Sequence, residues 1–360
     1  MRKINILVLP SINPKSFLRD GQKWAYFKYW PEGSYHIDLV GAFQIPFFSR
    51  YIEARYLKFF SIQALKAFFI RNQYDLIVAT GSQTIVGIAF LEYIMSLKKP
   101  KLVVFDVEKF GRKTSGLKLH LIQKACTSID LVIYHCSSQE QYYQKHLPQL
   151  QGKTRFLPLG VHPYEKTLGW RESNKDDYLI AFGTPQTWRV RRKIRGWQTL
   201  LDAWDLLKRK DITLKIVGQP RFTEREIGKS KVPEMIELHP FIPRDKLTPI
   251  VEKAKFALLP LWEVGHAQGQ LTLLYLMSLG KAVIVGNTIG VRDYVVDGET
   301  GLFYTPGNKE ELVQKIEFLL EYPEETEKIG RNAYEVVREK YSDKNFSEET
   351  YRAISQLFYE

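Results

Sequence analysis

The chain has 360 residues, 44% hydrophobic and 26% charged, which is typical of a soluble globular protein with room for two domains. No apolar run approaches the roughly 20 residues of a membrane-spanning helix, and the run 4–9, ended by Pro10, is too short for a signal peptide. The net charge of +12 lies wholly in residues 1–160, with 22 Lys and Arg against 10 Asp and Glu. This asymmetry indicates a polyanionic partner for the first half, with ordinary solubility as the alternative.

Short apolar strands alternate with helical segments in the first half. We expect strands at 4–9, 35–40, 75–79, 101–105, 131–134 and 154–157. This alternation predicts a parallel, doubly wound sheet. Ser82 and Gln83 follow the third strand, and Asp106 and Glu108 follow the fourth. Because ligands bind at the carboxyl ends of such strands, these four residues are candidates for ligand binding or for catalysis.

Residues 47–71 are rich in both aromatic and basic residues. On a helical wheel Arg50, Arg55, Lys58 and Lys66 share one arc, and apolar residues fall among them: Tyr51, Ile62, Leu65 and Phe69. A helix that only contacts a core would not place aromatic residues there. The segment therefore predicts an interfacial helix on an anionic membrane surface, and a buried helix with solvated charges is the alternative.

Two cysteines, Cys126 and Cys136, lie in or near apolar segments. Buried thiols without a disulfide suit a reducing compartment, so we expect a cytoplasmic protein, either free or peripheral on the inner membrane face. No His and Cys cluster has metal-ligand spacing, so we expect no metal and no cofactor.

The strand pattern restarts in the second half, at 178–182, 214–218 and 256–260. The border lies near 165–175, which predicts domains at 1–165 and 166–340. Two such domains facing one another would place a cleft between the carboxyl ends of their sheets.

A basic segment follows the first strand of the second domain. After Gly183 the cations are Arg189, Arg191, Arg192, Lys193 and Arg195. Arginine side chains match the geometry of phosphate oxygens, so this segment is a candidate for binding phosphate groups. A solvated basic loop is the alternative.

Residues 266–304 carry the densest pattern in the chain. Gly269 allows close backbone approach, Thr272 can cap the apolar helix that follows, and Gly280 ends that helix. A strand at 282–285 comes next. Gly290, Arg292 and Asp293 then predict a second helix start, and free N–H groups at helix starts hold anions.

The same stretch resembles the donor-binding region of glycosyltransferase family 4, whose members are retaining enzymes with the GT-B fold. The matching positions are Leu274, Met277, Gly280, Val283, Ile284, Gly290, Asp293, Asp297, Gly298 and Gly301. Residues 155–162 resemble the entry to the family's interdomain linker, and residues 195–201 resemble its Lys-Gly segment. The resemblance covers most of the chain, more strongly after residue 155.

The resemblance implies an α/β protein of two facing Rossmann-like, doubly wound domains. The first domain would bind the acceptor and the second the nucleotide sugar, and a helix at 341–360 would cross back to the first domain. Arg195 stands where the family has a phosphate-contacting Lys, and Asp293 stands where an acidic residue contacts sugar or ribose. Such enzymes need no bound metal.

The family's usual pair of Glu residues is absent, because Ala267 and Tyr275 occupy those positions. Glu263 is the only nearby carboxylate. Either the ribose and sugar hydroxyls are held differently, by Gln270, Thr272, Tyr275 or Glu263, or the donor is unusual, or activity is lost. The donor-binding candidates are Gly183, Arg189, Arg195, Gly269, Gln270, Leu271, Thr272, Tyr275, Arg292 and Asp293. The catalytic candidates are Asp106, Glu263 and Arg195, and the acceptor candidates are Ser82, Gln83 and Glu108.

The sequence therefore predicts a metal-independent retaining glycosyltransferase with a UDP- or GDP-linked donor. Its acceptor would be a glycan or a lipid-linked molecule. The missing acidic pair leaves an alternative, a catalytically impaired GT-B paralogue that serves as a binding or regulatory subunit. Nucleic-acid binding is not expected, because no nucleic-acid motif accompanies the charge.

Overall fold

The computed structural model describes residues 3–11, 26–57, 59–97, 99–107, 109–110, 115–164, 176–182, 195–218, 235–239, 242–265 and 267–358. The chain divides into two compact units. Unit 1 contains Met1–Pro158 together with Asp343–Glu360, and unit 2 contains Leu159–Ser342. The domain border expected at 165–175 lies outside the described residues.

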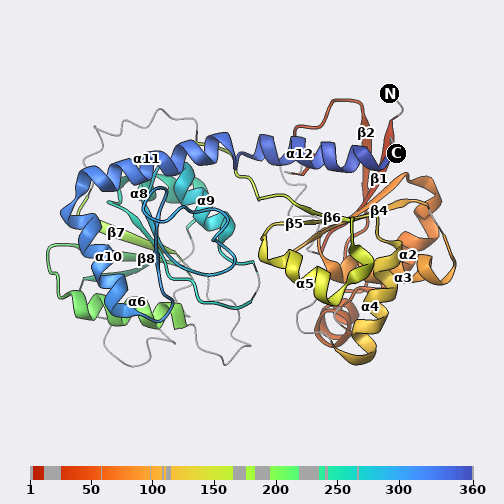
Figure 1. The fold of residues 1–360 in the computed structure, drawn as a ribbon, viewed down its shortest axis with the longest axis horizontal. Helices are drawn as coiled ribbons and strands as arrows, with labels where there is room; N and C mark the ends of the chain where they lie inside the picture. The colour runs from red at the N-terminus through yellow and green to blue at the C-terminus, as the bar shows by residue number, and fades with distance from the viewer. Residues whose placement is uncertain are drawn as a thin grey trace. The chain divides into compact units, whose positions relative to one another are not determined.

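Unit 1 is built on a six-stranded parallel sheet in the order β2-β1-β3-β4-β5-β6 (Figure 1). Its strands are β1 (Ile4–Leu9), β2 (Tyr35–Leu39), β3 (Leu76–Ala79), β4 (Lys101–Asp106), β5 (Leu131–Tyr134) and β6 (Thr154–Phe156). Every residue of β3 and β5 is buried, as expected for parallel strands covered on both faces.

One face of this sheet is covered by helices α2 (Ser61–Ile70), α3 (Ser82–Ile94), α4 (Gly116–Ser128) and α5 (Ser138–His146). Alternate strand residues such as Leu102 and Val104 join the same core cluster as Ala64, Ile85 and Ala125 from these helices. The helices therefore form a single layer over the sheet.

The C-terminal helix α12 (Asp343–Ser355) belongs to unit 1. Its Phe346 packs against Phe105 and His135, whose side chains point to the face opposite that of their strand neighbours. The Lys28 ammonium lies 2.9 Å from the Asp343 carboxylate, and the Tyr29 backbone N–H donates to the Ser347 hydroxyl. The last helix thus completes the core of the first unit.

Unit 2 contains a second six-stranded parallel sheet in the order β12-β11-β10-β7-β8-β9. Its strands are β7 (Tyr178–Phe182), β8 (Thr213–Val217), β9 (Ile236–His239), β10 (Ala257–Leu259), β11 (Val283–Gly286) and β12 (Leu302–Tyr304). Two core clusters cover its faces, with α6 (Arg195–Leu207) and α10 (Lys309–Glu321) in one and α8 (Arg244–Lys253), α9 (Gln270–Ser278) and α11 (Pro323–Glu339) in the other.

The predicted α/β class with two Rossmann-like sheets is confirmed, but one predicted helix is wrong and two strands were missed. Residues 47–71 do not form one helix. They divide into α1 (Pro46–Phe48), a π-helix at Ser49–Leu57 and α2. Strands β9 and β12 were not predicted. Among the helices of the described residues, none combines the length and hydropathy needed to cross a membrane.

His135 gives unit 1 a pH-dependent stability. Burial lowers the pKa of His135 to about 4, while its Nδ1 lies 2.7 Å from the Leu157 carbonyl oxygen. Between pH 6.5 and 4 the unfolded chain therefore binds more protons at this residue, so its contribution to stability is lost as the pH falls. Burial raises the pKa of Glu92 to about 8, which acts with the opposite sign.

Comparison of wild type with the variant His135→Gln isolates the contribution of the histidine to the pH dependence of stability. The difference in unfolding free energy between wild type and variant should shrink by about 1 kcal/mol per unit as the pH falls from 6.5 toward 5. Urea unfolding at pH 7.5, 6.5, 5.5 and 5 measures it. A difference that is constant over this range contradicts the prediction.

Candidate functional site

A pocket of about 310 Å³ lies at the carboxyl edge of the unit 2 sheet. It is lined by residues that follow three adjacent strands: Trp262 and Glu263 after β10, Asn287 and Arg292 after β11, and Thr305 and Pro306 after β12. This edge is where parallel α/β sheets hold their ligands. The pocket brings together two residues that the sequence singled out, Glu263 and Arg292.

Glu263 ties two loops of the pocket together. One carboxylate oxygen accepts from the backbone N–H of Gly265 at 2.7 Å, and the other accepts from that of Ile289 at 2.9 Å. The side chain is exposed, and each oxygen has a second lone pair. Glu263 is thus a fixed, accessible carboxylate that can accept hydrogen bonds from a sugar or ribose hydroxyl.

Arg292 supplies the positive charge of the pocket. Its Nε donates to the Asn287 side-chain oxygen at 2.7 Å, which fixes the plane of the guanidinium. The side chain is exposed, so the other donors of the guanidinium can reach a ligand. Trp262 lies against Gly307, where any added Cβ would sit 3.2 Å from the indole. The pocket therefore combines an anion-binding group, a carboxylate and a flat apolar ring.

Helix α9 begins one loop away from this pocket. Its N-cap is Gly269, in the left-handed region with φ of +86°, and the helix starts at Gln270. Thr272 therefore lies in the first turn and is not the cap, contrary to the sequence prediction. Leu271 is exposed and Gln270 is buried. The first-turn backbone N–H groups have no acceptor within the helix, which makes this end attractive to anions.

Tyr275 points toward α8. Its hydroxyl lies 2.9 Å from the Thr248 hydroxyl, and the Arg244 guanidinium lies 4.5 Å from its ring centroid. Burial raises the pKa of the Tyr275 phenol. The residue that replaces the usual acidic side chain is thus engaged with a neighbouring helix and does not line the pocket of Glu263 and Arg292.

The segment that contains Asp293 is a series of turns from 289 to 294, not the predicted helix start. The Asp293 carbonyl accepts from the Tyr341 hydroxyl at 2.7 Å, and the Tyr294 hydroxyl accepts from the Leu159 N–H at 2.9 Å. Tyr294 and Tyr341 also pack together, with ring centroids 5.2 Å apart. These contacts fix the loop that carries Arg292.

Glycine residues allow the close backbone approach that builds this edge. A Cβ on Gly196, at the start of α6, would lie 1.9 Å from the Pro260 carbonyl oxygen. A Cβ on Gly286, at the end of β11, would lie 2.4 Å from the Leu261 carbonyl oxygen. Both positions therefore exclude any larger residue unless the loop that leads to Trp262 moves.

Asp106, a catalytic candidate, is fully buried in unit 1. Its carboxylate accepts from the Tyr143 hydroxyl at 2.8 Å and from the Phe110 N–H at 3.0 Å. Gln139 donates to the Asp106 backbone carbonyl. In this structure Asp106 anchors the turn that follows β4.

Ser82 and Gln83 form the start of α3, at the carboxyl end of β3. Ser82 is buried, and the Gln83 carbonyl accepts from the Phe60 N–H at 3.0 Å. Gly183, Arg189 and Glu108 lie outside the described residues. Arg195 begins α6, but its side chain is likewise outside the described part of the chain.

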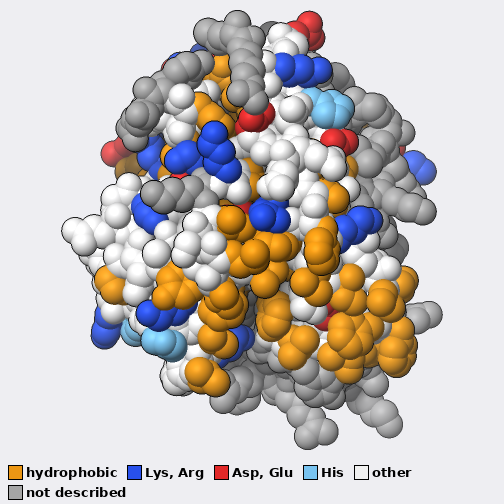
Figure 2. Space-filling model, turned by 90° about the vertical axis from the view of Figure 1, so that its right-hand side faces the viewer, with side chains coloured by type: hydrophobic (Ala, Val, Ile, Leu, Met, Phe, Trp, Pro, Cys, Tyr) orange, Lys and Arg blue, Asp and Glu red, His pale blue; other side chains and the backbone are white. Residues whose placement is uncertain are grey.

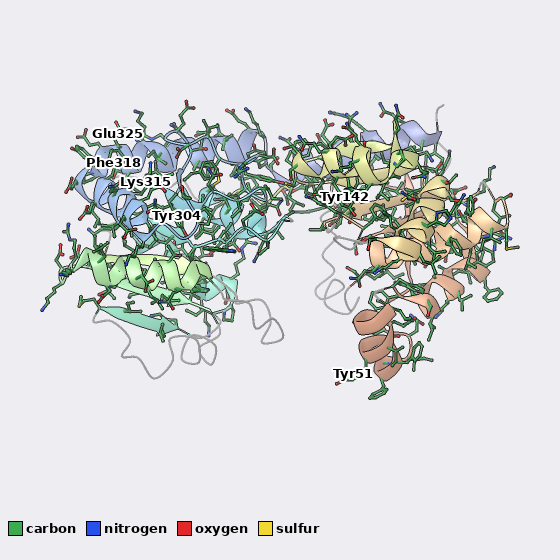
Figure 3. All side chains as sticks on the ribbon, turned by 60° about the horizontal axis from the view of Figure 1, so that its bottom comes forward. Tyr51, Tyr142, Tyr304, Lys315, Phe318 and Glu325 are labelled. Carbon is green, nitrogen blue, oxygen red and sulfur yellow. The ribbon has the colours of Figure 1, made fainter. Side chains whose placement is uncertain are left out.

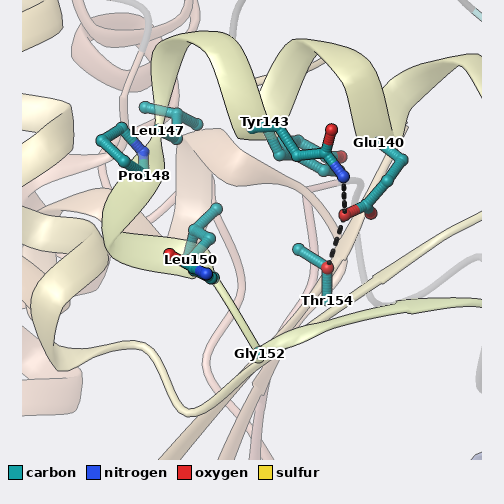
Figure 4. A pocket seen from close by; sticks show the side chains of 9 residues that line it. Glu140, Tyr143, Leu147, Pro148, Leu150, Gly152 and Thr154 are labelled. Carbon is teal, nitrogen blue, oxygen red and sulfur yellow. Dashed lines mark hydrogen bonds between the residues drawn. The ribbon is translucent and has the colours of Figure 1, made fainter.

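A second hollow, of about 420 Å³, lies in unit 1 between α5 and the start of β6 (Figure 4). There Glu140 accepts from Thr154 at 3.2 Å and from Gln144 at 3.3 Å. Thr154 is the first residue of β6, so this hollow is at the amino edge of the sheet. Ser82 and Gln83 lie at the opposite edge.

The sequence analysis did not identify Trp262 or Asn287 as pocket residues. The signal was present, because each lies two residues after the end of a predicted strand, at 256–260 and 282–285. The rule that selected Ser82 and Asp106 in unit 1 would have selected them in unit 2.

Comparisons with known proteins agree with this architecture. Residues 188–336 match the family model described as glycosyl transferases group 1. An uncharacterized glycosyltransferase of Haemophilus influenzae is 27% identical over 181 residues, covering 44% of this chain and 50% of the relative. The D-rhamnosyltransferase WbpZ of Pseudomonas aeruginosa is 25% identical over 262 residues, covering 68% and 64%. The chain thus spans about half to two thirds of these curated relatives.

Among solved structures, Anabaena Alr3699/HepE in complex with UDP superposes with a TM-score of 0.72 at 15% identity. The match covers 98% of this chain and 100% of that protein. Together with the two parallel sheets, this likeness identifies the GT-B fold.

The crowding at Gly286 can be tested against a loop glycine in open space. Gly286→Ala should lower the unfolding free energy by about 1–3 kcal/mol or more, because its Cβ would collide with backbone. Gly265 has φ of +75° and nothing within 4 Å, so Gly265→Ala carries only a conformational cost, about 1 kcal/mol. Urea unfolding compares the two. Equal losses would show that the close approach at Gly286 contributes nothing.

Proposed function

We propose that this protein is a retaining, metal-independent glycosyltransferase that moves a sugar from a nucleotide-sugar donor to a glycan or lipid-linked acceptor. The observation that carries the proposal is the pocket of Glu263 and Arg292 at the carboxyl edge of unit 2. It lies within the segment that matches the glycosyltransferase family model. The curated relatives with glycosyltransferase names support the same class.

In this proposal unit 2 binds the donor. Arg292 and the start of α9 stabilise the phosphate charge that grows as the sugar–phosphate bond breaks. Glu263 accepts a hydrogen bond from a sugar or ribose hydroxyl, and Trp262 provides a flat surface for stacking. The sequence adds Arg195 and the cations that precede it as further candidates for binding the pyrophosphate. Alr3699/HepE has been solved with UDP and with UDP-glucose, which supports a UDP-linked donor over a GDP-linked one.

The non-catalytic alternative depends on the loss of the acidic pair at Ala267 and Tyr275. Glu263 supplies a carboxylate to the pocket from another position, and two backbone N–H groups hold it there. The loss of the pair therefore does not leave the pocket without an acidic side chain. The match to a named rhamnosyltransferase also favours an active enzyme. In unit 1, Ser82 and Gln83 are the described candidates for contact with the acceptor.

Arg292→Ala should weaken binding of a nucleoside diphosphate by about tenfold or more, since a hydrogen bond between two charged groups is lost. Calorimetry with UDP and GDP measures the affinity. Arg331→Ala, which removes an exposed cation from α11, is the control and should bind as wild type. If wild type binds neither diphosphate, the proposed donor class is wrong.

Glu263→Gln should lower turnover by about 100-fold while the protein remains folded, because the amide retains one acceptor oxygen but loses the negative charge. Release of diphosphate from a panel of UDP- and GDP-sugars, with and without acceptor, measures turnover. Glu299→Gln changes an exposed carboxylate elsewhere in unit 2 and is the matched control. Unchanged turnover in Glu263→Gln would remove this residue from the mechanism.

A further inference from the structure

One outer face of unit 1 exposes large apolar side chains from several helical segments. Phe47 of α1 is 73% exposed, Phe69 of α2 is 79% and Leu117 of α4 is 76%. Tyr51, Leu65 and Ile94 are exposed as well. Figure 2 shows hydrophobic side chains gathered over the lower part of this face, and Figure 3 shows Tyr51 pointing outward from the tip of its segment. We call this set of six residues the apolar face.

The apolar face belongs to one continuous layer of the fold. Helices α2, α3 and α4 pack side by side over the sheet, and their inner positions, such as Ala64, Ile85 and Ala125, fill the core. Leu65 and Phe69 are one helical turn apart on α2 and point away from that core, since both are exposed. The side chains of the apolar face are therefore not part of the hydrophobic core of unit 1.

The segment that supplies the apolar face is rich in positive charge. Residues 40–128 contain 13 Lys and Arg but only 5 Asp and Glu. Three of those carboxylates, on Glu53, Glu92 and Asp106, are buried. On the helices that supply the apolar face, the exposed charged side chains among the described residues are Lys66 on α2 and Lys118 on α4. A partner for this face must therefore be both apolar and anionic.

We propose that this face docks unit 1 on an anionic phospholipid bilayer. Aromatic and aliphatic side chains enter the boundary between headgroups and acyl chains, and the surrounding cations interact with headgroup phosphates. A second copy of the chain fits less well, because two such faces would bring like charges together. The proposal rests on the proposed function only in its purpose, which is to bring a lipid-linked acceptor to the enzyme.

The docking surface also involves the helix that begins with the acceptor candidates. Ser82 and Gln83 start α3, the helix between α2 and α4. An acceptor anchored in the bilayer beneath this layer would reach the carboxyl edge of the unit 1 sheet along the same helices. This surface differs from the single amphipathic helix expected at 47–71, because it draws on α3 and α4 as well.

Vesicle co-sedimentation of the full chain tests the proposal. Wild type should bind vesicles of phosphatidylcholine with phosphatidylglycerol, more weakly at high salt, and far less to phosphatidylcholine alone. The triple variant Phe47→Ser, Phe69→Ser, Leu117→Ser should bind at least about tenfold more weakly. Its three sites are exposed, so folding should survive. Tyr322→Ser, which removes an exposed aromatic residue from unit 2, is the control and should bind as wild type.

Three results would overturn the proposal: no binding of wild type to either vesicle, equal binding by the triple variant, or a wild-type dimer that the triple variant abolishes in the absence of lipid binding. UDP and GDP affinity, measured on the same preparations, separates this proposal from the enzymatic one. Vesicle binding without nucleotide binding would leave the docking surface standing and remove the proposed function. Nucleotide binding without vesicle binding would remove the docking surface and leave the proposed function standing.

Discussion

Close backbone packing around Pro260 and Leu261 is the constraint on which the site of unit 2 depends. These two residues come directly after β10, and glycines surround them from three other elements. Gly196 in the first turn of α6 and Gly286 at the end of β11 would each place an added Cβ within 2.4 Å of a backbone carbonyl oxygen of this dipeptide, and Gly269, which caps α9, would place one 2.6 Å from the Leu261 side chain. The chain that emerges from β10 is thereby fixed before it reaches Trp262 and Glu263. Glu263 then fixes the next loop through the Ile289 N–H.

The strands of both sheets could be predicted because their burial is encoded locally. Segments such as 76–79 and 283–286 are apolar throughout, and only a parallel sheet covered on both faces buries every side chain of so short a run. Strands β9 (Ile236–His239) and β12 (Leu302–Tyr304) escaped detection because each is an edge strand of only four or three residues, too short for a periodic pattern to stand out. The division of 47–71 into separate helices was also missed. It depends on a tertiary contact, because the buried Glu53 carboxylate accepts from the Ser61 hydroxyl and the Ile62 N–H at the start of α2.

The candidate site could be predicted in part, for a similar reason. Glu263 could be predicted because it is the only carboxylate near the positions of the missing pair. In the structure it shares a pocket with Arg292. The direction of the Tyr275 side chain could not be predicted from sequence spacing. That direction is set by Thr248 and Arg244 on α8, so the position in the pattern does not determine where the side chain points. The buried bond between Asp106 and Tyr143 is likewise a contact across 37 residues.

The distribution of charge separates two anion-binding tasks. A nucleotide sugar is itself anionic, so an excess of charge that served the donor would be expected in residues 161–360, but these carry 30 basic and 30 acidic residues. Unit 2 instead uses a guanidinium fixed by Asn287 and the N–H groups of a helix start, which converge on a small ligand. In unit 1 the exposed cations Lys66 and Lys118 lie on two helices that also expose large apolar side chains. Dispersed charge beside apolar surface matches an extended anionic surface better than a single bound molecule, and this is why the bilayer is the partner we assign to unit 1.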